Sequence, residues 1–325
     1  MSTEQIAVEG EPSVPDERNT DPSFAPSVAR LTTEARPRLA KMHRSQVHRD
    51  RWPDFEAFDT ERYPFAVRRG AAVQWAGRAR NEYGSVHQFS SLTHALTVAR
   101  APLHLLGALA RLITDEVRHA ELCAEMAVAC DPAGPVREPR IFRFPVPRAP
   151  WGAPPLEIAS GDGPPRALYR WAADVVFCAC CIGETLSRPM LAAVETVATD
   201  PVVEAVAAQI LRDEHLHAQF GWEALAWLTP RLDPEAKRWL EQEQFPRRFA
   251  GFERSTARGH RIEDIAGQTI TIVPGDPSKP NLGTLTSEQY AAIYFATFER
   301  EILPKLRALG FEVDHAWAAR LHLLT

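Results

Sequence analysis

Thr-Asp-Glu-Val-Arg-His-Ala-Glu at residues 114–121 and Arg-Asp-Glu-His-Leu-His-Ala-Gln at residues 212–219 decide the fold of this chain. Both stretches contain the pattern Asp-Glu-x-x-His-Ala. Residues three apart on an α-helix lie on one face, one turn apart. Each pattern therefore offers a carboxylate oxygen and an imidazole nitrogen to one metal ion. The four residues concerned are Glu116, His119, Glu214 and His217.

Each motif follows a further glutamate that interrupts a stretch of small or apolar residues. Glu82 precedes the first motif glutamate by 34 residues, and Glu184 precedes the second by 30. A break is expected at Ala101-Pro102, where proline suits the first turn of a new helix. A second is expected at Thr199-Asp200-Pro201, a cap followed by proline at the first helical position. The chain should turn back at both. Because a helix rises about 1.5 Å per residue, each pair then lies at similar heights, within about 6 Å. All four carboxylates are predicted to meet in one layer.

Four glutamates and two histidines suit a pair of iron ions, and manganese or a mixed iron–manganese pair would suit the same donors. Buried carboxylates without cations are costly, because they must be paired, protonated or bound to metal. The alternative is a solvated Glu/His face on a metal-free helical protein, but the neighbours on these helix faces are largely apolar. Asp115 and Asp213 are each expected to accept the second N–H of a ligand histidine. The sequence leaves open which aspartate serves which histidine.

The pattern along the chain predicts an all-α fold, namely a four-helix bundle made of two helical hairpins, with one long crossover and extra C-terminal helices. The crossover contains ten prolines and cannot be a regular helix. A short helix is expected within residues 31–68. Residues 230–285 look less regular, and Gln268–Val273 could form a short strand. A last helical stretch is expected from Thr286 to about Leu309, stopped by Gly310 and kinked or interrupted by Pro304. The predicted parts are a disordered tail at 1–30 and a single domain at 31–325, with a bundle core at about 69–229, a crossover loop at 131–165 and a C-terminal extension at 230–325.

These residues resemble the ferritin-like di-iron carboxylate superfamily, whose members share the order Glu, ExxH, Glu, ExxH. The resemblance covers about residues 71–228. It is closest to uncharacterised bacterial ferritin-like domain proteins, through ITDEVRHAELC, IGETL and ILRDEHLHAQFGWEALAW. The chain is more distantly similar to arylamine N-oxygenases. Those enzymes add a histidine four residues before the last ligand glutamate, where this chain departs from the pattern with Ile210.

The resemblance implies a non-haem di-iron oxygenase or oxidase of bacterial secondary metabolism, with O₂ as co-substrate. The expected reaction is hydroxylation, N-oxygenation or desaturation of a small organic molecule, with electrons from an external donor such as a ferredoxin or a reductase. The catalytic and metal-binding residues would be the same six. Two alternatives stay open: a ferroxidase or other iron-handling protein, and a metal-free ferritin-like binding protein. A homodimer is a possible assembly, and a monomer or dimer in place of a cage would count against iron storage.

The amino-acid composition limits which partners and which cell compartment are expected. The net charge of −5 gives no reason to expect nucleic acid or an anionic membrane surface. No uncharged apolar run approaches the roughly 18 residues that a membrane span requires. Five cysteines without paired CxxC motifs are expected to be reduced, buried thiols in a cytoplasmic protein.

Several residues near the motifs have simpler interpretations. Glu121 and His215 lie off the ligand face and are expected to be supporting or surface groups. Two further pairs of residues are expected to line the interior. Cys180 and Cys181 should pack as small apolar side chains, while Gly183 and Gly221 could leave room for oxygen or substrate.

Overall fold

The computed structural model shows an all-α protein. Among the described residues the only strands are β1 (Ala29–Arg30) and β2 (Phe142–Arg143), which form one antiparallel pair of two residues each. β1 departs from the tail predicted at 1–30, of which residues 1–28 lie outside the described part. The described residues are 29–30, 37–48, 51–131, 142–144, 151–156, 165–265 and 272–324.

The first helical hairpin consists of α2 (Phe65–Val98) and α3 (Leu103–Cys130). The chain reverses at Arg100, which has a positive φ of 57°, and Pro102 is the N-cap residue of α3. Proline suits a helix start because the first amides of a helix have no acceptor within it. The predicted break at Ala101-Pro102 is confirmed.

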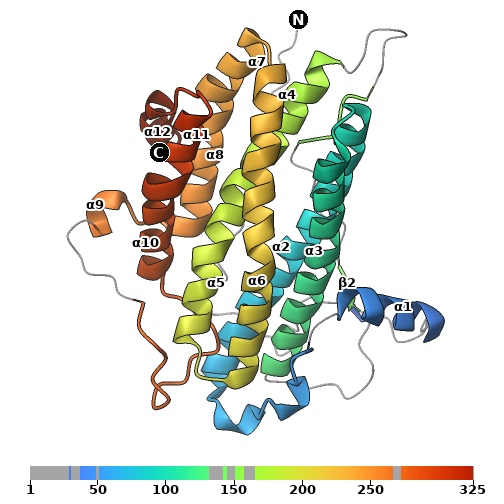
Figure 1. Ribbon diagram of the computed structural model, residues 1–325. Coiled ribbons are helices and arrows are strands. Elements are labelled where there is room, and N and C mark those ends of the chain that lie inside the picture. The colour runs from blue at the N-terminus through green and yellow to red at the C-terminus, as the bar shows by residue number, and fades with distance from the viewer. Residues whose placement is uncertain are drawn as a thin grey trace, which may run out of the picture.

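The second hairpin pairs a long helical rod with α6 (Pro201–Leu228). The rod is continuous through α4 (Arg166–Val175), the π-helical segment η3 (Val176–Glu184) and α5 (Thr185–Val197). The predicted cap is confirmed, since the Asp200 side chain accepts a hydrogen bond from the backbone two residues on. Figure 1 shows the rod and α6 running alongside the first hairpin.

Wide π-helical turns are a feature that the sequence pattern does not predict. In two of them a backbone N–H bonds to the carbonyl five residues back: Phe245 to Leu240, and Leu303 to Phe298. Pro246 and Pro304 follow directly. A proline ring clashes with the carbonyl four residues back in a regular α-helix, and a wider turn avoids that clash. The predicted interruption by Pro304 is thus confirmed in this form.

Residues 230–285 contain more helix than the sequence indicates. Their apolar spacing looks irregular because π turns break the 3.6-residue period. The expectation of weak regularity is therefore wrong for the first half of this region. The elements are η4 (Thr229–Arg231), α7 (Pro234–Trp239), η5 (Leu240–Gln244), α8 (Phe245–Phe252), η6 (Glu253–Ala257) and α9 (Ile262–Ile265).

The last helices start and stop where the sequence indicates. Thr286 and Gln289 form a capping box, and Gly310 ends the main stretch with a φ of 83°. Figure 1 shows these helices and α8 as an extra layer beside α5. The elements are α10 (Ser287–Thr297), η7 (Phe298–Ile302), α11 (Leu303–Ala308), α12 (Asp314–Ala319) and η8 (Arg320–Leu323).

The N-terminal region contains the short helix that the sequence suggests, α1 (Pro37–Val47). Two 3₁₀ turns, η1 (Phe55–Ala57) and η2 (Thr60–Arg62), lead from it towards α2. The Tyr63 hydroxyl donates a 2.6 Å hydrogen bond to Asp200, the cap of α6. This contact ties the N-terminal region to the second hairpin.

The apolar core is divided into two clusters by a polar layer. On α3, one cluster includes residues up to Leu112 and the other begins at Leu122; on α6, the division falls between Ile210 and Phe220. Both motifs lie in this gap. Glutamates and histidines therefore occupy a complete cross-section of the interior, which a packed apolar core would otherwise fill.

The predicted strand at Gln268–Val273 lies mostly outside the described residues, and its last two residues are not in a strand. Most of the crossover at 131–165 also lies outside them. The stretch Arg166–Val197 is long and apolar enough to cross a membrane by length and composition, but 61% of its most apolar window is buried inside the protein. It also carries the buried Asp174 and Glu184. This burial is typical of a core helix in a soluble protein.

Candidate metal centre

The structure brings all six predicted ligand residues together in the polar layer. Glu82 comes from α2, the first motif from α3, Glu184 from the end of η3 and the second motif from α6. Three overlapping groups have ligand atoms within 4.8 Å of one another, and between them they include every one of the six. The groups are Glu82, His119 and Glu214; Glu116, His119 and His217; and Glu184, Glu214 and His217.

Both histidines turn the same ring atom, Nδ1, towards the carboxylates. His119 Nδ1 lies 3.6 Å from a Glu214 oxygen and 3.9 Å from a Glu82 oxygen. His217 Nδ1 lies 3.1 Å from Glu116, 3.6 Å from Glu184 and 3.9 Å from Glu214. Glu214 therefore lies close to both imidazoles, with one oxygen towards each, and Glu116 also has a ligand atom within 4.8 Å of both rings. This is the position of a bridging ligand.

Several ligand oxygens and nitrogens that face one another in this layer are buried but form no hydrogen bonds. Both carboxylate oxygens of Glu116 and of Glu214, and the Nδ1 atoms of His119 and His217, make no hydrogen bond of acceptable geometry. Orphaned buried polar atoms are rare in proteins and require an explanation. Here their separations of 3–4 Å suit donors that converge on a cation between them. The donor set thus fits a transition-metal pair.

The ionisable side chains in this layer shift one another's pKa values. Burial raises the pKa of Glu116 and of Glu214 well above the usual range, and the nearby charge of Glu184 raises both further. Burial also disfavours ionisation of Glu184, but the imidazole of His217 outweighs it and lowers the pKa of that carboxyl. The surrounding carboxylates, led by Asp115, raise the pKa of His217 despite its burial. Without cations the layer holds protons, which bound metal ions would replace.

The two aspartates resolve the assignment that the sequence leaves open. Asp213, in the second motif, lies 3.3 Å from Nε2 of His119, in the first. Asp115, in the first motif, lies 3.5 Å from Nε2 of His217, in the second. Each aspartate therefore serves the histidine of the other hairpin. An Nε2–H of His119 donated to Asp213 leaves Nδ1 of that ring with a lone pair facing the carboxylates. Nε2 of His217 faces Asp115 but makes no hydrogen bond of acceptable geometry.

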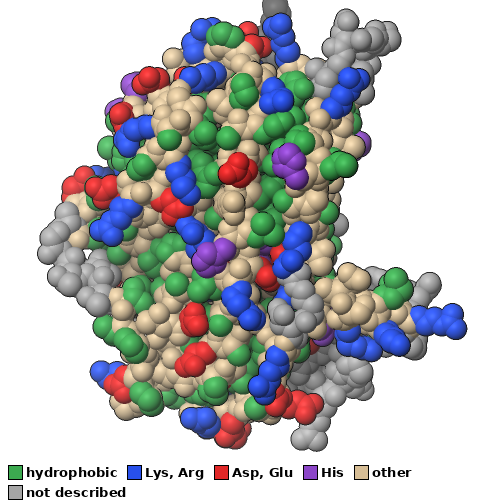
Figure 2. Space-filling view, in the orientation of Figure 1, with side chains coloured by type: hydrophobic (Ala, Val, Ile, Leu, Met, Phe, Trp, Pro, Cys, Tyr) green, Lys and Arg blue, Asp and Glu red, His purple; other side chains and the backbone are tan. Residues whose placement is uncertain are grey.

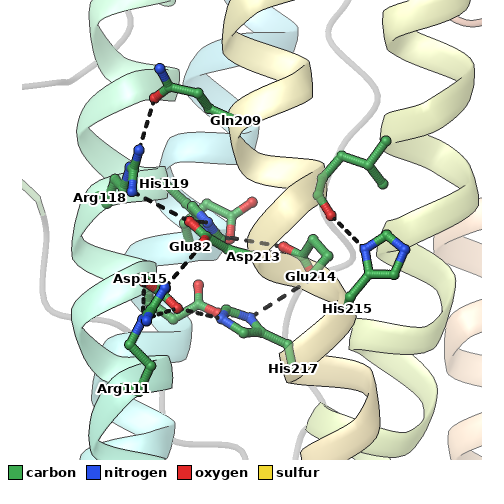
Figure 3. A network of polar contacts seen from close by, with 12 residues as sticks. Glu82, Arg111, Asp115, Arg118, His119, Gln209, Asp213, Glu214, His215 and His217 are labelled. Atoms are coloured by element: carbon green, nitrogen blue, oxygen red, sulfur yellow. Dashed lines mark hydrogen bonds and ion pairs between the residues drawn. The ribbon is translucent and has the colours of Figure 1, made fainter. Parts of the chain in front are cut away.

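Arg111 joins the two aspartates and was missed by the sequence reasoning. Its Nε lies 2.9 and 2.8 Å from the two oxygens of Asp115, and its terminal nitrogen lies 3.3 Å from Asp213 (Figure 3). The i,i+4 spacing of Arg111 and Asp115 was a signal that could have revealed it. Arg111 thus links the two aspartates, and together with His217 it lowers the pKa of Asp115 despite the burial of that carboxyl.

A second arginine lies deeper in the interior. Arg118 is 1% exposed, donates to Gln209 at 3.1 Å and lies 3.7 Å from Asp213. Gln209 in turn donates to the Arg51 backbone carbonyl. Figure 3 shows this chain of contacts leading from the centre along α3 and α6, while His215 points away from the centre. The interpretation of His215 as a supporting or surface group is thus consistent with its placement.

A cavity of about 790 Å³ reaches the centre beside Glu82 and Glu184. Glu82 is also the most exposed of the six, with 18% of its side chain accessible. The stacked rings of Tyr83 and Phe144, whose centroids are 4.8 Å apart, line the cavity. This size and lining are typical of small-molecule sites.

The glycines beside the ligands differ in role. A Cβ on Gly221 would lie 2.7 Å from the backbone carbon of Cys180, so close helix packing requires glycine there. The expectation that Gly221 leaves room for oxygen or substrate is therefore wrong. A Cβ on Gly183 would make only ordinary contacts, and Gly183 lines the cavity. Cys180 and Cys181 are fully buried in the apolar core, and all five cysteines are free and buried, as predicted.

Comparisons with known proteins found no matching family model, no matching curated protein and no matching solved structure. What this centre does is therefore inferred from its own geometry.

Proposed function

We propose that this chain is a ferritin-like four-helix-bundle enzyme whose centre holds two iron ions and uses O₂ to oxidise a small organic molecule. The observation that carries the proposal is the polar layer: six residues of ligand type converge, and four of them, Glu116, His119, Glu214 and His217, have buried ligand atoms without hydrogen bonds. A resemblance of the motifs to di-iron carboxylate proteins supports iron. Manganese, or one ion of each, suits the same donors.

The six predicted residues would hold the metal ions in this proposal, and Glu116 and Glu214 are the two carboxylates that lie close to both histidines. A di-iron pair held by these six residues would supply oxygen activation, that is, the reductive chemistry that no amino-acid side chain provides. The protein's own part is positioning. Asp115 and Asp213 fix both imidazoles with Nδ1 inward, and Arg111 holds the aspartates. The apolar clusters on both sides of the layer exclude water from it.

The cavity gives the substrate its approach. It reaches the centre beside Glu82 and Glu184, so a bound molecule would lie next to one carboxylate from each hairpin. The cavity walls mix aromatic and aliphatic side chains with polar and charged ones, among them Arg78, Asn81 and Arg258, which suits a small organic molecule that carries polar groups. Reduction of O₂ requires electrons that these side chains do not supply. An external donor such as a ferredoxin or a reductase therefore belongs to the proposal, as does a reducing cytoplasm, which suits five free cysteines.

The test is metal loading followed by oxygen consumption. Protein loaded anaerobically with ferrous iron and desalted should retain about two irons per chain. Exposure to O₂ should then give a fast, single-turnover uptake of oxygen. The Glu116→Ala/Glu214→Ala double variant should retain little iron and show no uptake, and Gly183→Ala, which leaves all ligands in place, should match the wild type in iron content. Wild-type protein that retains no iron, or iron that does not react with O₂, would contradict the proposal.

A further inference from the structure

A second cluster of metal-ligand type lies where α1 meets α3. His43 Nε2 lies 2.7 Å, and His48 Nε2 3.1 Å, from the same carboxylate oxygen of Glu121. We propose that these three residues bind one zinc ion, which fastens α1 to the side of α3. The site is separate from the polar layer, because Glu121 faces α1 and none of the six centre residues belongs to this group.

The chemistry of the donors points to a transition metal. Two imidazole nitrogens and one carboxylate form a common three-residue zinc set, with water at the fourth position. Donor atoms around tetrahedral zinc are about 3.3 Å apart. The separation of His48 from Glu121 already approaches this value, and that of His43 needs to widen by about 0.6 Å. Side-chain exposures of 38% for His43 and 19% for His48 and Glu121 leave room for that movement and for water.

The local structure holds the two histidines ready. His43 is on α1, and His48 follows the last residue of that helix, so the two rings are separated by little more than one helical turn. Trp52 stacks on the His48 ring, with centroids 3.6 Å apart and planes inclined by 11°. This stacking restricts the plane of the ring, and the 3.1 Å contact with Glu121 directs Nε2 towards that carboxylate. Pre-positioned ligands lose less entropy when an ion binds.

α1 has little else to hold it in place. Among its described side chains only Val47 is buried, while Leu39 and Met42 are 60% and 64% exposed. Figure 1 shows α1 projecting from the side of α3, and Figure 2 shows basic side chains gathered on it. A helix of 11 residues is marginal by itself in water. An ion shared between α1 and α3 would supply the missing attachment.

The experiment is a zinc titration of the full chain against a competing chelator. Wild-type protein should bind one more zinc ion than the His43→Ala and His48→Ala variants, each of which should bind at that site at least about tenfold more weakly. His94→Ala removes an exposed histidine of α2 and should match the wild type. Because the buried centre also binds metal, the series is repeated in the Glu116→Ala/Glu214→Ala chain, where one zinc site should remain.

A second measurement follows the protection of the backbone amides of α1. Amide hydrogen exchange within residues 38–47 should slow when zinc is added to the wild type, and should not change in His48→Ala. Equal zinc binding by wild type, His43→Ala and His48→Ala would overturn the proposal, as would unchanged exchange in α1. Neither outcome depends on iron or oxygen at the buried centre, so the two proposals can fail separately.

Discussion

The first hairpin is regular α-helix along both of its arms, whereas the second contains the nine-residue π segment η3, which ends at the ligand Glu184. The two hairpins therefore carry ligands in the same order, Glu followed by ExxH, but one arm of the second hairpin has a π-helical backbone. Glu82, from the regular arm, is partly exposed and lies at the cavity, whereas Glu184 is 7% exposed. Wide turns often occur at functional sites because they shift the side chains that follow them.

The supporting groups are also unequal. Arg111 lies five residues before Glu116, and the equivalent position before Glu214 is Gln209. Both arginines that contact the aspartates, Arg111 and Arg118, thus come from α3. The duplicated motif provides the ligands in both hairpins, and α3 of the first hairpin supplies Arg111 and Arg118 beside the aspartates. The two halves of the centre should therefore respond differently to substitution.

The largest expected effect separates Glu214 from Glu82. Glu214 lies near both histidines and Glu82 near His119 alone. Glu214→Gln should lose both ions, while Glu82→Gln should keep about one iron per chain. Elemental analysis after iron loading and desalting measures this directly. Equal losses in the two variants would show that Glu214 does not bridge.

The next largest effect is expected from the crossed pairing, in which each aspartate contacts the histidine of the other hairpin. Asp213→Asn should weaken the ion near His119, and Asp115→Asn the ion near His217, by about 10–100-fold each. The reason is that an amide no longer holds the imidazole N–H as a carboxylate does. Arg111→Met should weaken both ions. Chelator competition measures the affinities, and an effect of Asp213→Asn confined to the ion near His217 would contradict the crossed pairing.

Packing around η3 gives a stability prediction. Gly221→Ala should lower the free energy of unfolding by about 1–3 kcal/mol, because the added methyl meets the Cys180 backbone. Gly183→Ala is the matched control, with a change below about 1 kcal/mol. Urea unfolding of both variants tests this. Equal stabilities would mean that α6 and η3 pack less closely than the structure shows.

The smallest expected effect is a gradual change in the stability of the metal-free protein with pH. In the metal-free protein, the pKa values of Glu116, Glu214 and His217 are raised above their unfolded values. Their stabilising contribution is complete below about pH 4.5 for the glutamates and is lost as the pH rises towards the folded pKa values. Each group contributes a slope of at most about 1.4 kcal/mol per pH unit. Thermal unfolding of metal-free protein should therefore shift to lower temperature as the pH rises, and bound iron should remove that trend.

The motifs alone were enough to predict the hairpins, the turn at Pro102, the Asp200 cap and the convergence of the six residues. These features depend on local periodicity and helix length, which sequence spacing records directly. The partners of Glu121 and the crossing of the aspartates depend on which helices touch, so spacing could not reveal them. The π segments were also missed, because each inserts a residue into the period that reveals helices.

The polar layer itself is tested most directly by anomalous X-ray scattering at the iron edge from iron-loaded crystals. We expect two peaks between α3, α6, Glu82 and Glu184, one beside Nδ1 of His119 and one beside Nδ1 of His217. Glu214 should contact both. No peak in this layer, or a peak next to Nε2 instead of Nδ1, would contradict the account.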